Sequence, residues 1–257
     1  SLHSASAIIF SIDAITAECE LKKNIDASVF YLEAPTGSGK SNTAMNLSFT
    51  FMKQNEYIRK IFYIYPFNTL VEQNMDSINK VFGENKEVMA QVALVNSLVP
   101  LKERVDEDEW NGKDESEKYQ RILLDRQFLN YPIVLSTHVM LFRTLFGQYK
   151  EDAFGFYQLC NSVIVLDEIQ SYRNALWAEI ITFFKGFAEL LNIKIIIMSA
   201  TLPNLEMLTE NQAKTVRLVK EREKYFKHPK FAKRVVANYE LLDQKITLDE
   251  LMKHILG

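Results

Sequence analysis

The sequence predicts an α/β fold, with a mostly parallel sheet that is flanked by helices on both faces. Short apolar runs alternate along the 257-residue chain with longer segments whose apolar residues recur at helical spacing. The runs are apolar throughout instead of at every second position, which indicates strands buried on both faces. A glycine-rich turn also separates the first apolar strand from the helical segment that follows it.

The elements are expected in a regular order along the chain. We expect strands at residues 27–34, 60–67, 87–95, 132–137, 162–168, 193–201 and 234–242. We expect helices at residues 4–23, 40–54, 68–82, 138–146, 175–192 and 248–257. Pro66 ends the second strand, and Asn68 or Thr69 is a plausible N-cap of the helix that follows. Residues 102–118 are charged and mostly acidic, which favours a surface loop or an exposed helix start.

The composition changes near residue 214, and we place a boundary there. Residues 1–213 are expected to form one α/β domain, and residues 214–257 a basic connector with a terminal appendage. Between residues 214 and 236 the chain has nine Lys or Arg and two Glu. Such a segment could flank a nucleic-acid path, and a solvated linker explains it equally well.

Composition and charge exclude several classes of protein. A net charge of −3 and a pI near 5.9 argue against nucleic-acid binding by bulk charge, although a local basic groove stays open. Cys19 and Cys160 lie far apart, which favours a reduced, cytoplasmic protein over a disulfide or zinc scaffold. No apolar run is long enough for a membrane span. The chain starts without Met or a signal peptide, and we expect it to be part of a larger protein.

The turn after the first strand, GSGKS, has the residues of a phosphate-binding loop. Glycines allow successive backbone N–H groups to point at one anion, and the following helix adds its N-terminal dipole. Lys40 can reach the β- and γ-phosphates of ATP, and the Ser41 hydroxyl can bind Mg²⁺. The usual pattern has glycine where this chain has Ala34, so an ordinary glycine turn is the alternative. The expected nucleotide-binding residues are Pro35, Thr36, Gly37, Ser38, Gly39, Lys40 and Ser41.

Two carboxylates close the apolar strand VIVL. Asp167 is expected to hold Mg²⁺, usually through water, and Glu168 to orient and deprotonate the attacking water. Carboxylates next to a core are costly without a partner, which favours a functional role over a structural one. The alternative is that Glu168 only caps a helix.

Small hydroxyl side chains close the next strand, in the segment MSATLP. Ser199 and Thr201 lie at the carboxyl end of the predicted sheet, where ligands bind in open α/β folds. A polar strand end without function is the alternative for this segment alone. The position of this segment after DEIQ in the chain strengthens the case for a functional role.

Together, these segments resemble the first RecA-like domain of superfamily 2 helicases. The chain order is APTGSGKS, YPFNTLVEQN, VLSTHVMLF, LDEIQ and MSATLP, between Val29 and Pro203. The DEIQSY and YPFNTLVEQN segments look like the CRISPR-associated helicase–nuclease of type I systems, or its helicase-only form. DEAD-box RNA helicases would show Ala-Asp where this chain has Ile169 and Gln170.

The resemblance implies further roles for individual residues. Lys40, Glu168 and Gln170 would act in catalysis, and Gln170, Ser199 and Thr201 would couple the γ-phosphate to closure onto a partner domain. The backbone of single-stranded DNA would lie against Pro66, Asn68, Thr69, Ser136 and Thr137. Short hydroxyls and amides at strand ends suit phosphate contacts without base reading. Thr69 and Thr137 could instead, or also, be helix N-caps.

The resemblance also implies the reaction and the partners. It implies a prokaryotic, cytoplasmic motor that hydrolyses Mg²⁺-ATP to move along and unwind DNA for degradation of invading DNA. Its partners would be single-stranded DNA, a Cascade-type effector complex, a second RecA-like domain and a nuclease domain. The four histidines lie apart in the sequence, so we expect no nuclease site in this chain, and we expect His138 to pack or cap locally. Another superfamily 2 helicase, for DNA or RNA, and a weakly catalytic RecA-like docking module are the alternatives.

Two expected elements of such motors are missing from the sequence. The first glutamine, Gln54, follows the phosphate loop, so an upstream glutamine that reads adenine is absent from this chain. The second motor domain, with its arginine fingers, is not in the sequence, and such an arginine is worth about 10³- to 10⁵-fold in rate. We therefore expect this chain alone to bind ATP weakly and to hydrolyse it very slowly.

Overall fold

The structure is a computed structural model of the 257-residue chain. It describes residues 14–95, 114–171, 177–200, 215–232 and 247–252, except residue 249. The expected strand at 234–242 and Thr201 lie outside these residues. No helix in the described ranges is long and apolar enough to cross a membrane.

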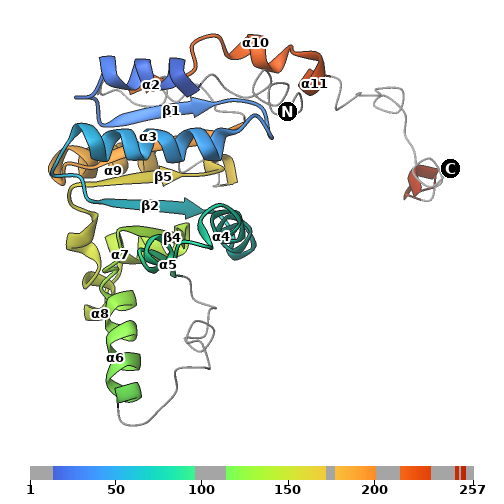
Figure 1. Cartoon of the computed structure of the whole chain (residues 1–257). Helices are drawn as coiled ribbons and strands as arrows, with labels where there is room; N and C mark the ends of the chain where they lie inside the picture. The colour runs from blue at the N-terminus through green and yellow to red at the C-terminus, as the bar shows by residue number, and fades with distance from the viewer. Residues whose placement is uncertain are drawn as a thin grey trace.

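A seven-stranded sheet forms the centre of the molecule (Figure 1), and every paired strand is parallel to its neighbour. The strand order is β3-β4-β2-β5-β6-β1-β7. The strands are β1 Val29–Glu33, β2 Lys60–Tyr65, β3 Val92–Val95, β4 Ile133–Thr137, β5 Ser162–Leu166, β6 Lys194–Ser199 and β7 Thr215–Arg217. This confirms the predicted parallel sheet. β1, β3, β5 and β6 are buried along their whole length, as their continuous apolar runs require.

Helices cover both faces of the sheet, as predicted. On one face, apolar residues of α2, α3 and α4 share a core with alternate strand residues such as Phe30 and Val165. On the other face, α7 and α9 pack on the intervening residues, such as Tyr31 and Ile164. Figure 1 shows α3 and α9 on opposite sides of the sheet. The larger helices are α2 Ala14–Lys23, α3 Lys40–Gln54, α4 Asn68–Phe82, α6 Asp114–Gln127, α7 His138–Phe146 and α9 Trp177–Leu190.

The remaining helical elements are short. They are α5 Lys86–Ala90, α8 Lys150–Ala153, η3 Phe156–Leu159, η4 Ile169–Ser171, α10 Arg222–Phe226 and α11 Pro229–Ala232. The first of them corrects the predicted strand at 87–95, because only Val92–Val95 is extended. The Asn85 side chain accepts a hydrogen bond from Val88 N at 3.1 Å, and this cap starts a helical turn instead.

The strand β7 comes from the segment that the sequence assigns to the basic connector. Its residues Thr215 and Val216 pair with Val29 and Phe30, so the sheet extends past the expected boundary at residue 213. Leu218 N also donates to Tyr31 O at 2.9 Å. α10 follows directly, and Arg222 in this helix forms an ion pair with Glu33, the last residue of β1.

Candidate nucleotide and nucleic-acid site

The loop between β1 and α3 has a backbone that only glycine adopts without strain. Gly37 and Gly39 have φ values of 78° and 86°, both in the left-handed region. Gly39 is also the N-cap of α3, so the loop leads directly into the positive end of a 15-residue helix. The Ser38 hydroxyl is buried and has no hydrogen-bond partner among the described residues. The loop therefore has the form of an anion cradle with a polar group still to be satisfied.

Lys40 lies in the first turn of α3, and its side chain folds back over the loop. Its Nζ donates to the carbonyls of Ala34 at 2.9 Å and Pro35 at 3.3 Å. Burial lowers the pKa of Lys40, while the negative charges of Glu168 and Asp167 oppose this change. The lysine is thus held at the loop by weak carbonyl acceptors, next to two carboxylates, where a phosphate would be a better partner.

The two carboxylates follow β5 at the same edge of the sheet. Asp167 N donates to Ile64 O at 2.9 Å, and Asp167 Oδ1 accepts from Glu168 N at 2.9 Å. Burial, and then the charge of Glu168, raise the pKa of Asp167 to about 6, although the Glu168 N–H and Lys40 act in the opposite direction. Glu168 itself has a φ of 49°. A non-glycine residue in this region stores strain, which is characteristic of functional sites.

Gln170 connects this carboxylate pair to β6. Its Nε2 donates to Glu168 Oε2, and its Oε1 accepts from Ser199 Oγ at 2.5 Å. Ser199 O in turn accepts from Ala34 N at 3.3 Å, which returns the network to the phosphate-binding loop. The sequence predicted these residues as a group, but it did not predict the direct contact between Gln170 and Glu168.

The five predicted nucleic-acid residues fall into an accessible and a buried set. Pro66 and Asn68 are half-buried and Thr69 is exposed, in the turn from β2 into α4. The N-cap of α4 is Phe67, which is 60% exposed, so neither Asn68 nor Thr69 caps this helix.

Ser136 and Thr137, at the end of β4, form the buried set. Ser136 Oγ donates to Val95 O at 2.5 Å. Thr137 is the N-cap of α7, and its Oγ1 accepts from Met140 N at 3.4 Å. Thr137 is therefore a helix cap, which the sequence indicated as an alternative or additional role. Its side chain is buried and is not accessible to a nucleic-acid strand from solution.

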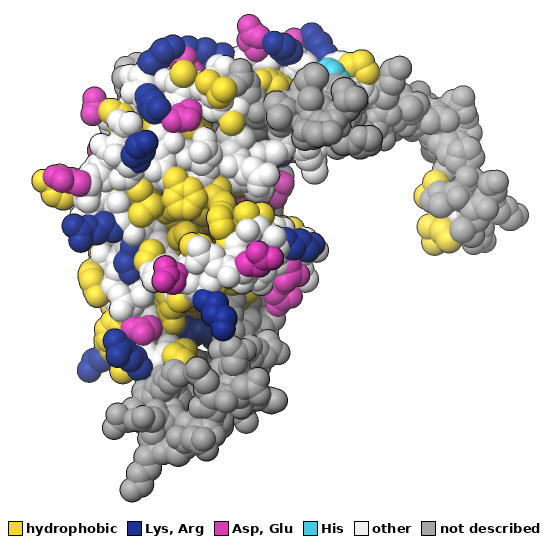
Figure 2. Space-filling view, in the orientation of Figure 1, with side chains coloured by type: hydrophobic (Ala, Val, Ile, Leu, Met, Phe, Trp, Pro, Cys, Tyr) yellow, Lys and Arg dark blue, Asp and Glu magenta, His cyan; other side chains and the backbone are white. Residues whose placement is uncertain are grey.

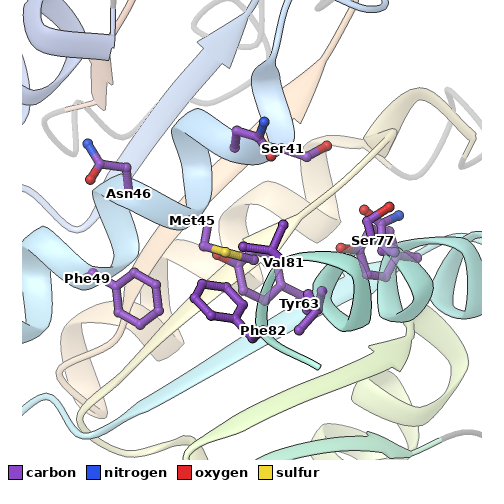
Figure 3. A pocket seen from close by; sticks show the side chains of 12 residues that line it. Ser41, Met45, Asn46, Phe49, Tyr63, Ser77, Val81 and Phe82 are labelled. Carbon is purple, nitrogen blue, oxygen red and sulfur yellow. The ribbon is translucent and has the colours of Figure 1, made fainter. Parts of the chain in front are cut away.

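A cavity of about 350 Å³ lies beside the phosphate-binding loop, between α3 and α4. Figure 3 shows Ser41 at one end of it, with Met45, Tyr63, Val81 and Phe82 toward the middle. In Figure 2, hydrophobic side chains gather in the middle of this face of the molecule. Ser41 is exposed, so its hydroxyl is accessible for binding a cation next to the loop.

Three observations show that the described residues suit the binding of Mg²⁺ and a nucleoside triphosphate. The positive-φ glycines form an anion cradle, the buried Ser38 hydroxyl has an unused hydrogen-bonding capacity, and Asp167 provides a hard oxygen ligand near Lys40. Ser41 and Asp167 would hold the ion. Among the described residues, no three His, Cys, Asp or Glu side chains converge as a metal site, and the absence of a nuclease centre stays a prediction.

The family comparison agrees with this geometry. A family model for the DEAD/DEAH box helicase matches residues 15–208, well over half of the chain. Among curated proteins, the chain is 26% identical over 176 residues to the putative CRISPR-associated nuclease/helicase Cas3 of Methanocaldococcus jannaschii. That alignment covers 68% of this chain and 23% of the relative, so the chain spans about a quarter of the relative's length.

Solved structures confirm the predicted RecA-like helicase fold. The DUF1998 helicase MrfA bound to DNA gives a TM-score of 0.51 at 18% identity, over 79% of this chain and 25% of that one. T. fusca Cas3 with ADP gives a TM-score of 0.50 at 18% identity, over 73% of this chain and 20% of that one. At this identity the likeness shows the fold and not the substrate.

Proposed function

Because the chain belongs to the DEAD/DEAH box helicase family, we propose that it is the ATP-binding motor domain of a CRISPR-associated DNA helicase. The observation that carries the proposal is a chain of hydrogen bonds that runs from Glu168 through Gln170 and Ser199 to Ala34, at the phosphate-binding loop. Lys40 lies in the same loop region, close enough for the charges of Glu168 and Asp167 to act on it. A simple glycine turn would not need this network.

Each residue of the network has a role in the proposed reaction. The loop backbone and Lys40 bind and orient the β- and γ-phosphates. The phosphate oxygens then replace the two backbone carbonyls that accept from Lys40 Nζ in this structure. Glu168 accepts the proton of the attacking water at a carboxylate oxygen. When bound, Mg²⁺ supplies charge neutralisation for the phosphates, and Ser41 and Asp167 are the residues that would hold it.

Gln170 is the proposed link between hydrolysis and movement. Its amide contacts the base Glu168 on one side and Ser199 on the other, so a shift of either changes the position of the other. Thr201 follows in the same segment and is proposed to share this role. In the full-length protein, the partner that reads the shift would be a second RecA-like domain.

DNA is the proposed track, and degradation of invading DNA the proposed purpose. The curated relative supports this, because it is named a putative CRISPR-associated nuclease/helicase. Pro66, Asn68 and Thr69 would contact the sugar-phosphate backbone of the strand. A Cascade-type complex, a nuclease domain and a prokaryotic cytoplasm belong to the same proposal.

Duplex unwinding by the full-length protein tests the proposal. We expect ATP- and Mg²⁺-dependent unwinding of a DNA duplex with a single-stranded overhang, and no unwinding of the matched RNA duplex. Lys40→Ala should abolish it. Preferential unwinding of the RNA duplex would favour a helicase of another branch of superfamily 2. Binding of the duplex without ATP and without unwinding would favour a docking module.

A further inference from the structure

We infer that His138 is a positioning residue that ties the segment after β4 to the Asp167 backbone across the end of β2. The inference deepens the proposed function, because it assigns a physical link between the nucleic-acid segment and the carboxylate that would hold Mg²⁺. The role assigned to His138 rests on the proposed function. The contact itself is argued from strand register, burial and a hydrogen bond.

Strand register places the three chain segments in one row. Thr137 in β4 pairs with Tyr65 in β2, and Ile64 in β2 pairs with Leu166 in β5. Asp167 continues β5 by one residue and donates its N–H to Ile64 O. β4 and β5 are not neighbours, because β2 lies between them. A direct contact between their ends must therefore cross the end of β2.

His138 makes this contact. It is the first residue of α7, directly after the Thr137 cap, and only 5% of it is exposed. Its imidazole is hydrogen-bonded to the backbone of Asp167. Because the Asp167 N–H is already donated to Ile64 O, the acceptor on this backbone is the Asp167 carbonyl. A histidine that only packed locally at a helix start, as the sequence suggested, would not need this partner on a different strand.

The ring acts as a hydrogen-bond donor. An imidazole carries at least one N–H in either protonation state, and this N–H donates to the Asp167 carbonyl. Such a donor fixes the peptide that carries Asp167, in the way that outer-shell partners orient metal ligands.

The position of His138 in the chain indicates how a bound strand would affect Asp167. The buried pair Ser136 and Thr137 immediately precede it, and Ser136 is anchored on Val95 O. Their side chains are covered, so a bound strand would act on this segment through its backbone and neighbours. Any displacement of the start of α7 moves the His138 ring, and the ring moves the Asp167 peptide.

The test uses three substitutions of His138 and one control in the full-length protein. His138→Leu removes the donor and keeps an apolar group of similar size. His138→Asn and His138→Gln place an amide N–H near the two ring-nitrogen positions. Leu141→Ala is the control: Leu141 lies in α7, is 4% exposed and packs in the apolar core on that face of the sheet, without a polar group to offer Asp167. Circular dichroism and thermal melts establish that each variant is folded.

Nucleotide affinity is the first readout, measured by calorimetry with Mg²⁺ and again with EDTA. We expect His138→Leu to weaken ATP binding roughly 10-fold in Mg²⁺ and to leave the affinity in EDTA unchanged. One of the two amide variants should recover the Mg²⁺-dependent affinity. The single-strand-stimulated kcat, as second readout, should fall in His138→Leu by a similar factor with its DNA affinity unchanged.

The outcomes separate the inference from the function on which it rests. Unchanged Mg²⁺-dependent affinity in His138→Leu would overturn the inference, as would an equal loss in Leu141→Ala. Failure of both amide variants to recover binding would also overturn it, because it would make the ring a packing element. If the wild-type protein shows no DNA-stimulated turnover, the proposed function fails, and the calorimetric comparison still decides the role of His138.

Discussion

The hydroxyl of Ser199 donates a hydrogen bond of 2.5 Å to the side-chain oxygen of Gln170. The two residues are 29 positions apart: Ser199 is the last residue of β6, and Gln170 lies in η4, after β5. The side-chain Nε2 of Gln170 in turn donates a hydrogen bond to Oε2 of Glu168, the proposed general base. The end of β6 is therefore connected to the carboxylate by side chains alone, through a single glutamine.

Removal of the Ser199 hydroxyl should separate hydrolysis from nucleotide binding. Ser199→Ala loses a hydrogen bond worth about 1 kcal/mol, which corresponds to roughly a fivefold loss in kcat if the bond orients Glu168. ATP affinity should not change. Steady-state ATPase assays of the full-length protein with single-stranded DNA measure the effect. Ser48→Ala is the control, because Ser48 is buried in α3 and its hydroxyl donates to Ala44 O within the same helix. Equal losses in both variants would contradict the role of Ser199.

Replacement of the proposed base should keep ATP bound and stop its hydrolysis. Glu168→Gln retains the shape of the side chain and an oxygen for Gln170, but it cannot accept the proton of water. We expect turnover to fall about 10²- to 10⁴-fold, with Mg²⁺-ATP affinity retained. Single-turnover kinetics and calorimetry on the same samples make the comparison. Near-normal turnover would show that another group is the base.

The ion pair between Glu33 and Arg222 should stabilise the start of the phosphate-binding loop. The Glu33 side chain is 9% exposed and the side chain of its partner Arg222 46%, and Arg217 Nη1 lies 3.9 Å from the same carboxylate. A double-mutant cycle with Glu33→Gln and Arg222→Ala should give a coupling free energy of about 1 kcal/mol in urea unfolding.

Lys224→Ala is the matched control for this cycle. Lys224 lies in the same helix, α10, and its partner Glu221 is 3.8 Å away and mostly exposed. Its loss should cost only a few tenths of a kcal/mol. A coupling energy near zero for Glu33 and Arg222 would show that β7 and α10 are held by the sheet alone.

Lys60 should give the stability of the chain a measurable pH dependence. Its half-buried Nζ donates to Leu129 O at 2.8 Å, and burial lowers its pKa to about 8. Between pH 8 and the ordinary pKa of 10.5, the unfolded chain binds more protons at this residue than the folded chain, so its contribution to stability rises with pH. Below pH 8 the charged form costs stability in full.

The comparison with Lys60→Met isolates this effect. From pH 7 to 9.5, the unfolding free energy of the wild type should rise relative to the variant by about 1 kcal/mol, after allowance for solvent screening. Urea unfolding at each pH gives the difference. Lys53→Met, at an exposed site in α3, should show no such trend. If the difference in unfolding free energy between wild type and Lys60→Met does not change with pH, the lowered pKa of Lys60 is contradicted.

Sequence patterns predicted β1 to β6, because these strands are mostly apolar runs, but they missed β7, a short strand in the segment assigned to the connector. They also predicted that the phosphate-binding loop and Asp167 would serve one Mg²⁺-nucleotide site, and the structure places Lys40 near the Asp167 carboxylate. Local capping was harder to predict: Asn85 turns residues 86–90 into a helix although their composition suits a strand. Contacts across non-neighbouring strands, such as His138 to Asp167, carry no periodic signal and needed the three-dimensional order of strands.

Calorimetry of Mg²⁺-ATP binding to this chain, beside Lys40→Ala, tests the central claim most directly, with turnover measured with and without single-stranded DNA. The account predicts weak binding that Lys40→Ala abolishes, and negligible turnover in both conditions. Binding that survives in Lys40→Ala would contradict the assignment of the phosphate-binding loop. Robust DNA-stimulated turnover by this chain alone would contradict the requirement for a second motor domain.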